Sequence, residues 1–235
     1  MSKQIQEDLD QILKQLLHVG GIVEEAVDKS LRALLGRDLE AGAEVIDSDN
    51  VIDDLELEIE EKCLDVLALR QPVAKDLRLV TAVMKINSDL ERIGDLAVNI
   101  AERSEVLAAI EHLPFRPDVS RMAAVTKKMV AQGLDALIKQ DAKLALRVWD
   151  MDDEPDRLYR EVLGEASHFM QTNPKRIGDT LHLLGALRNL ERIADHATNI
   201  AEDVIFMVEG RIVRHRIEEH RRRANGHSSQ LSADR

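Results

Sequence analysis

The chain has 235 residues, of which 44% are hydrophobic and 2% aromatic, and its formal net charge is −12. This length suits one large domain or two small ones, and the acidic balance argues against nucleic acid as a partner. Cys63 is the only cysteine, so an intrachain disulfide is excluded, and we expect its thiol to be buried among apolar residues. The sequence starts without the apolar stretch of a signal peptide, and no apolar run is long enough to span a membrane, so we expect a cytoplasmic protein.

Apolar residues recur every three or four positions along almost the whole chain, which is the period of an amphipathic helix. Gly, Pro and Asp residues interrupt this pattern at places where helices begin or end. The pattern predicts an all-α protein with six helices, over residues 3–35, 38–70, 73–110, 118–139, 141–172 and 175–209. Pro155 should kink or interrupt the fifth of them.

The first three predicted helices are repeated in the next three. Residues 31–50 align with residues 134–153, and ERIGDLAVNIAE at 91–102 returns as ERIADHATNIAE at 191–202. Two tandem three-helix bundles are the simplest architecture with this repeat. We place the first bundle at 1–112 and the second at 113–210. A basic tail at 211–235, which we expect to be flexible, follows them.

The repeat also preserves acidic residues, which apolar packing alone does not require. On an ideal helix Glu91, Asp95 and Asn99 lie within about 80° of one another, opposite the apolar side. The preceding helix of each half carries two acids four residues apart, where like charges repel and a bound cation would compensate. Carboxylate and amide oxygens suit Mg²⁺, Mn²⁺, Ca²⁺ or iron. The candidate metal ligands are Asp49, Asp53, Glu91, Asp95, Asn99, Asp152, Asp156, Glu191, Asp195 and Asn199.

Other interpretations of these acids remain open. They can form a solvated polar face, or Arg92 and Arg192 can pair with them and remove the need for a metal. A di-iron oxidase bundle needs two Glu-x-x-His helices, and here only residues 165–168 have that spacing. His182 and His196 have no histidine counterparts in the first half, so we expect them to be surface or packing residues.

Two stretches carry a resemblance to a known family. RQPVAKDLRLVTAVMKINSDLERIGDLAVNIAE at 70–102 and NLERIADHATNIAEDVIFMVEG at 189–210 resemble the two signature regions of PhoU proteins. The resemblance covers about residues 5–212 and implies two similar three-helix bundles whose E(D)xxxD motifs bind metal clusters at the surface. These motifs fall on Asp49/Asp53, Glu91/Asp95, Asp152/Asp156 and Glu191/Asp195. The expected cofactors are divalent or ferric ions (Mg, Mn, Fe or Zn).

The same resemblance implies a function. A PhoU-like protein is expected to be a non-enzymatic regulator of phosphate homeostasis. It would be an accessory of the Pst phosphate transporter and a negative regulator of the phosphate-starvation response. The implied partners are the transporter's ATPase subunit (PstB) and a PAS-containing phosphate sensor histidine kinase (PhoR). We expect a homodimer that reaches the inner face of the membrane through these partners. The alternative from another class is a metal-dependent hydrolase or oxidase that acts through the repeated carboxylates.

Overall fold

The computed structural model describes residues 3–110, 113–115 and 117–213; most of the predicted tail at 211–235 lies outside this range. The described residues form helices and no strand, so the predicted all-α class is confirmed. The α-helices are α1 (Lys3–Gly36), α2 (Leu39–Asp47), α3 (Asp49–Arg70), α4 (Lys75–Ala108), α5 (Val119–Lys139), α6 (Ala142–Trp149), α7 (Asp153–Thr172) and α8 (Ile177–Glu209). A short 3₁₀ helix, η1 (Pro174–Arg176), precedes α8.

The six predicted helices are all present, and the second and the fifth are each broken in two. The break in the fifth falls at residues 150–152, just before the predicted position. Pro155 lies in the first turn of α7, where backbone N–H groups have no partner within the helix, so it is tolerated there. The matching break at Ser48 was not predicted. The Ser48 hydroxyl donates to the Val45 carbonyl oxygen at 3.1 Å, a local bond that competes with helix continuation.

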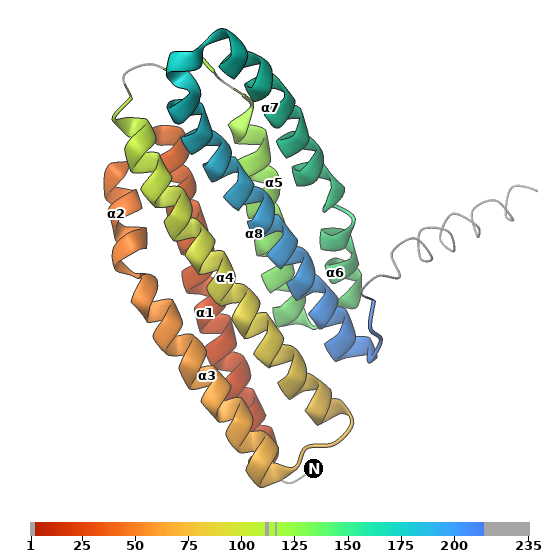
Figure 1. Cartoon of the computed structure of the whole chain (residues 1–235). Coiled ribbons are helices and arrows are strands. Elements are labelled where there is room, and N and C mark those ends of the chain that lie inside the picture. Colours follow the sequence, from red (N-terminus) through yellow and green to blue (C-terminus); the bar gives the residue numbers. More distant parts are fainter. Residues whose placement is uncertain (1–2, 111–112, 116, 214–235) are drawn as a thin grey trace, which may run out of the picture.

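Each half of the chain is a three-helix bundle, as the repeat predicts. The first bundle consists of α1, the broken pair α2–α3 and α4, and the second of α5, the broken pair α6–α7 and α8. In Figure 1, α4 and α8 lie side by side in the middle, with α3 beyond α4 and α7 beyond α8. The helices α1 and α5 lie behind them and also contact each other.

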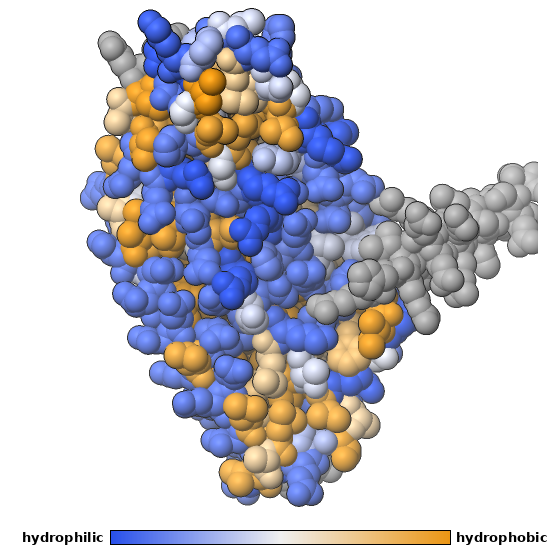
Figure 2. Space-filling model, viewed as in Figure 1, coloured by the Kyte–Doolittle hydropathy of each residue, from blue (hydrophilic) through white to orange (hydrophobic). Residues whose placement is uncertain are grey.

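The two bundles share one hydrophobic core. Leu90 and Ile93 of α4 and Leu190 and Ile193 of α8 are fully buried members of a single cluster that draws on both halves. Cys63 is buried in the same cluster, as expected. Among the described residues, no helix is both long enough and apolar enough to cross a membrane. Figure 2 shows that hydrophilic side chains cover the middle of the face that carries α4 and α8, with hydrophobic patches toward its two ends.

Candidate metal centres

The first group of carboxylates lies between α3 and α4. Asp49 is the first residue of α3, Asp53 follows one turn later, and Asp95 projects from α4. One oxygen from each of these three side chains lies within 4.8 Å of the other two. Three of the five ligands predicted for this half are therefore brought together.

The other two predicted residues of the first half have different contacts. Glu91 Oε2 lies 3.3 Å from Arg92 Nε, and Arg92 Nη1 lies 3.1 Å from Asp95 Oδ2. The pairing that the sequence left open as an alternative to a metal is thus present here. Because the Arg92 side chain is 56% exposed, this ion pair contributes little stability and a bound cation can displace it. Asn99 turns back onto its own helix and donates from Nδ2 to the backbone oxygen of Asp95 at 2.7 Å.

The second group of carboxylates lies between α7 and α8 and uses a different third member. Asp156, Glu191 and Asp195 each offer an oxygen within 4.8 Å of the other two. Asp152, the counterpart of Asp49, accepts a hydrogen bond from the hydroxyl of Thr198 at 2.9 Å. The equivalent position in the first half is Val98, which has no hydroxyl to draw Asp49 away. Asn199 is also engaged elsewhere and donates to Asp89 of α4 at 3.2 Å.

Burial, and after it the crowding of acids, raises the pKa of several of these groups. Partial burial, followed by the charges of Asp53 and Asp95, raises the pKa of Asp49. Burial together with the Asp195 carboxylate raises the pKa of Glu191, and burial raises the pKa of Asp195, with a further contribution from Asp152. The pKa of Glu91 is raised in the same way. A proton or a metal cation at either group relieves this repulsion.

One atom of the second group provides a direct test of fit for a metal. The Glu191 side chain is only 9% exposed, and while Oε1 accepts from Arg188, Oε2 is buried and has no hydrogen-bond partner. A buried carboxylate with one unpaired oxygen, close to two further carboxylates, is the arrangement that a hard cation completes. Three carboxylates in each group suit Mg²⁺, Mn²⁺ or iron better than Zn²⁺, whose sites draw mainly on nitrogen and sulfur.

The raised pKa values predict how the metal-free protein responds to pH. A carboxyl group whose pKa is higher in the folded than in the unfolded protein stabilises the fold at low pH, and this contribution is lost as pH rises through the raised pKa. In the parent, the unfolding free energy of the metal-free protein should fall as the pH rises from 4.5, the ordinary pKa of a glutamate, toward neutrality. We therefore expect this fall to be smaller in Glu191→Gln, which has no carboxyl group at this position. Urea unfolding in the presence of a chelator, at several pH values, measures this slope. An identical slope in the variant and the parent would contradict the expectation.

The sequence reasoning missed a residue that positions the first group. Gly94 of α4 faces Ile52 of α3, and a Cβ at this position would lie 2.9 Å from Ile52 Cδ1. Because Ile52 sits between Asp49 and Asp53, the glycine allows α3 to bring both acids close to Asp95. The sequence did contain a signal for this residue, because the two copies of the repeat differ here: the counterpart of Gly94 in the second copy is Ala194.

Gly94→Val is expected to push α3 away from α4, lowering the unfolding free energy by about 1–3 kcal/mol and weakening metal binding at the first group only. Metal titration followed by calorimetry, together with urea unfolding, checks both effects. Gly21→Val is the matched control, because no atom lies within 4 Å of a Cβ built there. Equal metal affinity in both variants would show that the close approach is unimportant.

His196 is a partly buried residue of the contact between the two halves. Its Nδ1 lies 2.7 Å from Oδ1 of Asp89 on α4, and neither residue is among the predicted ligands. His182 is half-buried on the same helix. Both histidines are thus packing residues rather than members of the carboxylate groups, in line with the expectation for them.

Comparison with known proteins agrees with this fold. The family model of the PhoU domain matches residues 16–104 and again residues 119–204. A phosphate-specific transport system accessory protein PhoU homolog of Pseudomonas aeruginosa is 40% identical over 216 residues, covering 92% of this chain and 89% of the relative. The homolog of Aquifex aeolicus is 41% identical over 211 residues, covering 89% of this chain and 95% of the relative.

Solved structures give the same result. The crystal structure of PhoU from Pseudomonas aeruginosa matches with a TM-score of 0.85 and 40% identity, over 88% of this chain and 99% of that one. The phosphate transport system regulatory protein PhoU from Streptococcus pneumoniae matches with a TM-score of 0.82 and 29% identity, over 89% of this chain and 99% of that one. The relatives bear the names of transport accessory and regulatory proteins, not of enzymes. With two matched domains that span most of its length, this chain belongs to the PhoU family.

Proposed function

We propose that this protein is a non-enzymatic accessory and regulator of phosphate transport. The support is the high identity, over nearly the whole length, to proteins named as accessories of the phosphate-specific transport system. It acts as a negative regulator of the phosphate-starvation response. Its site of action is the inner face of the membrane, which it reaches through its partners.

The finer proposal is a homodimeric, metal-binding adaptor between the ATPase subunit of the Pst transporter (PstB) and a PAS-containing sensor histidine kinase (PhoR). The observation that supports metal binding is the pair of carboxylate groups in equivalent places of the two bundles. Bound cations neutralise part of an otherwise acidic surface, so metal occupancy would tune attraction to basic surfaces on the partners.

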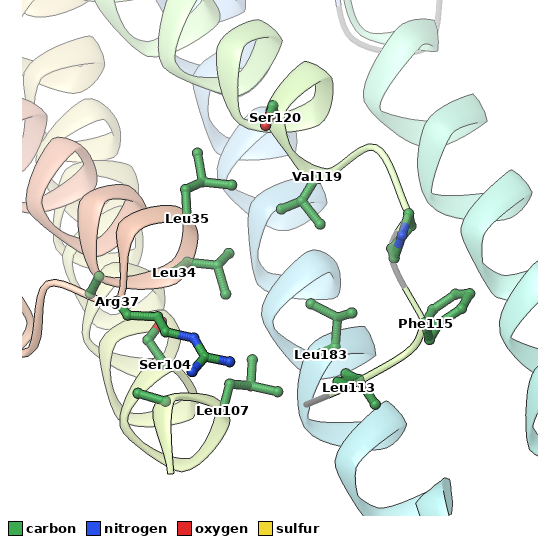
Figure 3. A pocket seen from close by; sticks show the side chains of 13 residues that line it. Leu34, Leu35, Arg37, Ser104, Leu107, Leu113, Phe115, Val119, Ser120 and Leu183 are labelled. Atoms are coloured by element: carbon green, nitrogen blue, oxygen red, sulfur yellow. The ribbon is translucent and has the colours of Figure 1, made fainter. Parts of the chain in front are cut away.

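The placement of the acids favours an adaptor over the hydrolase or oxidase alternative. A metal-dependent enzyme needs a substrate pocket beside its metal. Figure 3 shows a pocket between the ends of α1 and α4 and the segment before α5, lined by Leu34, Leu107 and Phe115 together with Arg37 and Ser104. Neither this pocket nor two others among the described residues includes any of the ten candidate ligands.

A deletion strain tests the regulatory role. Without this protein, phosphate-scavenging genes should stay on in phosphate-rich medium, and a variant that lacks both carboxylate groups should partly reproduce this state. A pull-down with membranes from phosphate-fed and phosphate-starved cells should recover the transporter ATPase and the kinase. Normal repression in the deletion strain would overturn the proposed function, and turnover of phosphate esters by the Mn²⁺-loaded protein would favour the enzyme instead.

A further inference from the structure

The turn between α3 and α4 presents exposed apolar side chains. Leu69 and Val73 are 72% and 73% exposed, more than any other large hydrophobic residue in the described part of the chain. Leu77, in the first turn of α4, is exposed too, whereas Pro72 is buried and holds the turn against the body of the protein. Figure 2 shows hydrophobic side chains at this end, which is the lower end of the view in Figure 1. We call residues 69–78 the α3–α4 tip.

The α3–α4 tip also carries cations without an ionic partner. Asp76 is the single acid of this stretch, against three basic residues, Arg70, Lys75 and Arg78. Arg70 is paired with Asp8 at 2.8 Å. Lys75 and Arg78 make no ion pair within the described part of the chain, and Lys75 is exposed. Cations beside exposed apolar side chains form a surface that anionic lipid attracts.

The basic tail begins beside the same tip. A Cβ added to Gly210, the C-cap of α8, would lie 3.2 Å from Nε and Cζ of Arg78, so the end of α8 lies against the tip. Ile212, two residues further, is 64% exposed. Residues 211–235 hold seven Arg and three acids, a balance of +4, so the rest of the chain carries −16. At about 3.3 Å for each extended residue, residues 214–223 can reach about 33 Å along a surface that touches the tip.

The opposite end of the molecule is apolar but less basic. Ile177 and Leu181, in the first two turns of α8, are exposed there. The counterpart of Arg78 in the repeat is Gly178, which has no charge. The basic tail starts at the other end of α8, which is about 50 Å long. Exposed apolar side chains and clustered cations therefore coincide at the α3–α4 tip.

We propose that the α3–α4 tip and the basic tail dock together on the surface of an anionic lipid bilayer. Leu69, Val73 and Ile212 enter the boundary between headgroups and acyl chains. Lys75, Arg78 and the arginines of the tail lie at the level of the lipid phosphates. The rest of the chain, with its charge of −16, is repelled by anionic lipid, so the molecule stands on this end.

This inference goes beyond the proposed function, in which membrane proteins bring the chain to the membrane. Direct contact with lipid needs no protein partner, so vesicles that contain no protein test it separately from the regulatory role. A weak contact with lipid and a contact with a membrane protein would reinforce each other, because the first raises the local concentration for the second.

Cosedimentation of the full chain with vesicles made of equal parts of phosphatidylglycerol and phosphatidylcholine tests the proposal. The parent should bind these vesicles at low salt, should not bind pure phosphatidylcholine, and should be released as salt rises. Replacing Leu69 and Val73 together by Ser should weaken binding at least about tenfold, because two apolar side chains no longer leave water. Ile177→Ser with Leu181→Ser is the matched control from the opposite end and should leave the affinity unchanged. Circular dichroism during heating establishes that each variant is folded.

A second variant tests the tail within the full chain. Arg221, Arg222 and Arg223 are three consecutive basic residues, and all three are replaced by Gln. Each basic residue near an anionic membrane surface strengthens binding about fivefold, so their loss should weaken it about a hundredfold.

Equal binding of the parent and the Leu69/Val73 variant would overturn the proposal, because the tail alone would then make the contact. Equal binding of the parent and the triple arginine variant would overturn the role of the tail. The proposal also fails if the chain does not bind anionic vesicles at low salt, or binds both kinds of vesicle equally. Recovery of the chain only by vesicles that hold the reconstituted transporter would mean that a protein, and not lipid, covers the tip.

Discussion

Replacing Asp53 and Asp95 together by Ala is expected to empty the first metal centre and leave the second occupied. The two residues supply two of the three carboxylates that come together between α3 and α4. Loss of a residue that merely orients a ligand costs a site about 10–100-fold in affinity, so loss of two direct ligands should cost more than about a hundredfold. Elemental analysis should show the metal content of the purified protein falling by the share of one centre, and calorimetric titration should show one binding phase instead of two.

The reciprocal variant, Asp156→Ala with Asp195→Ala, should empty the second centre alone. Asp54→Ala is the matched control for the first variant, because Asp54 is an exposed acid of α3, the helix of Asp53, and lies outside the first carboxylate group. Removal of repelling acids should leave the metal-free protein as stable as the parent, or more stable by a few tenths of a kcal/mol for each pair. If a variant that lacks all four residues keeps its metal, the carboxylate groups are not the binding sites.

Leu90→Ala and Leu190→Ala are each expected to lower the unfolding free energy by about 2–5 kcal/mol. These leucines occupy equivalent places of the repeat, on α4 and α8, and both are fully buried in the core that the two bundles share. Because each bundle buries part of its surface against the other, loss of a core side chain in one half should destabilise both. Urea unfolding followed by circular dichroism should therefore show one cooperative transition, shifted to lower urea by either substitution.

This experiment also bears on the proposed division at residues 112 and 113. Leu57→Ala, at a position that is 57% exposed on α3, should change the unfolding free energy by less than about 0.5 kcal/mol. Two separate transitions, each moved by only one of the two core substitutions, would mean that the bundles fold as independent domains.

Helices and their repeat were predictable from the sequence because they depend on residues close together in the chain. The period of apolar residues gave the six helices, and the shift of about 100 residues gave the two bundles. The same comparison located the acids of both carboxylate groups, because their helical spacing places them on one face before any tertiary contact is known.

The third carboxylate of each centre was not predictable in this way. Asp49 joins the first group and Glu191 joins the second, although each has an acidic counterpart in the other half. In the second half Thr198 binds Asp152, and in the first half Glu91 contacts Arg92, whereas Glu191 pairs with Arg188 through one oxygen and keeps the other without a partner. These contacts depend on side-chain directions that helical spacing does not specify.

The contact between α4 and α8 could not be predicted from the sequence either. Aligning the two halves on each other says which residues correspond, but not which surfaces of the halves meet. The informative sign was a difference between the copies, because a histidine at 196 in place of Leu96 marks a polar contact that only one half makes.

If the two carboxylate groups hold metal as proposed, their unequal third member has a consequence for how the protein responds to changes in ion supply. Sites with different ligand sets fill at different free-ion concentrations, so loading proceeds through a state in which one bundle holds metal and the other does not. Occupancy then changes over a wider range of ion concentrations than two identical sites would cover. A protein built from a repeated unit therefore acquires a graded dose–response once the copies diverge at a single ligand, with the half-filled form as a distinct third condition besides empty and full.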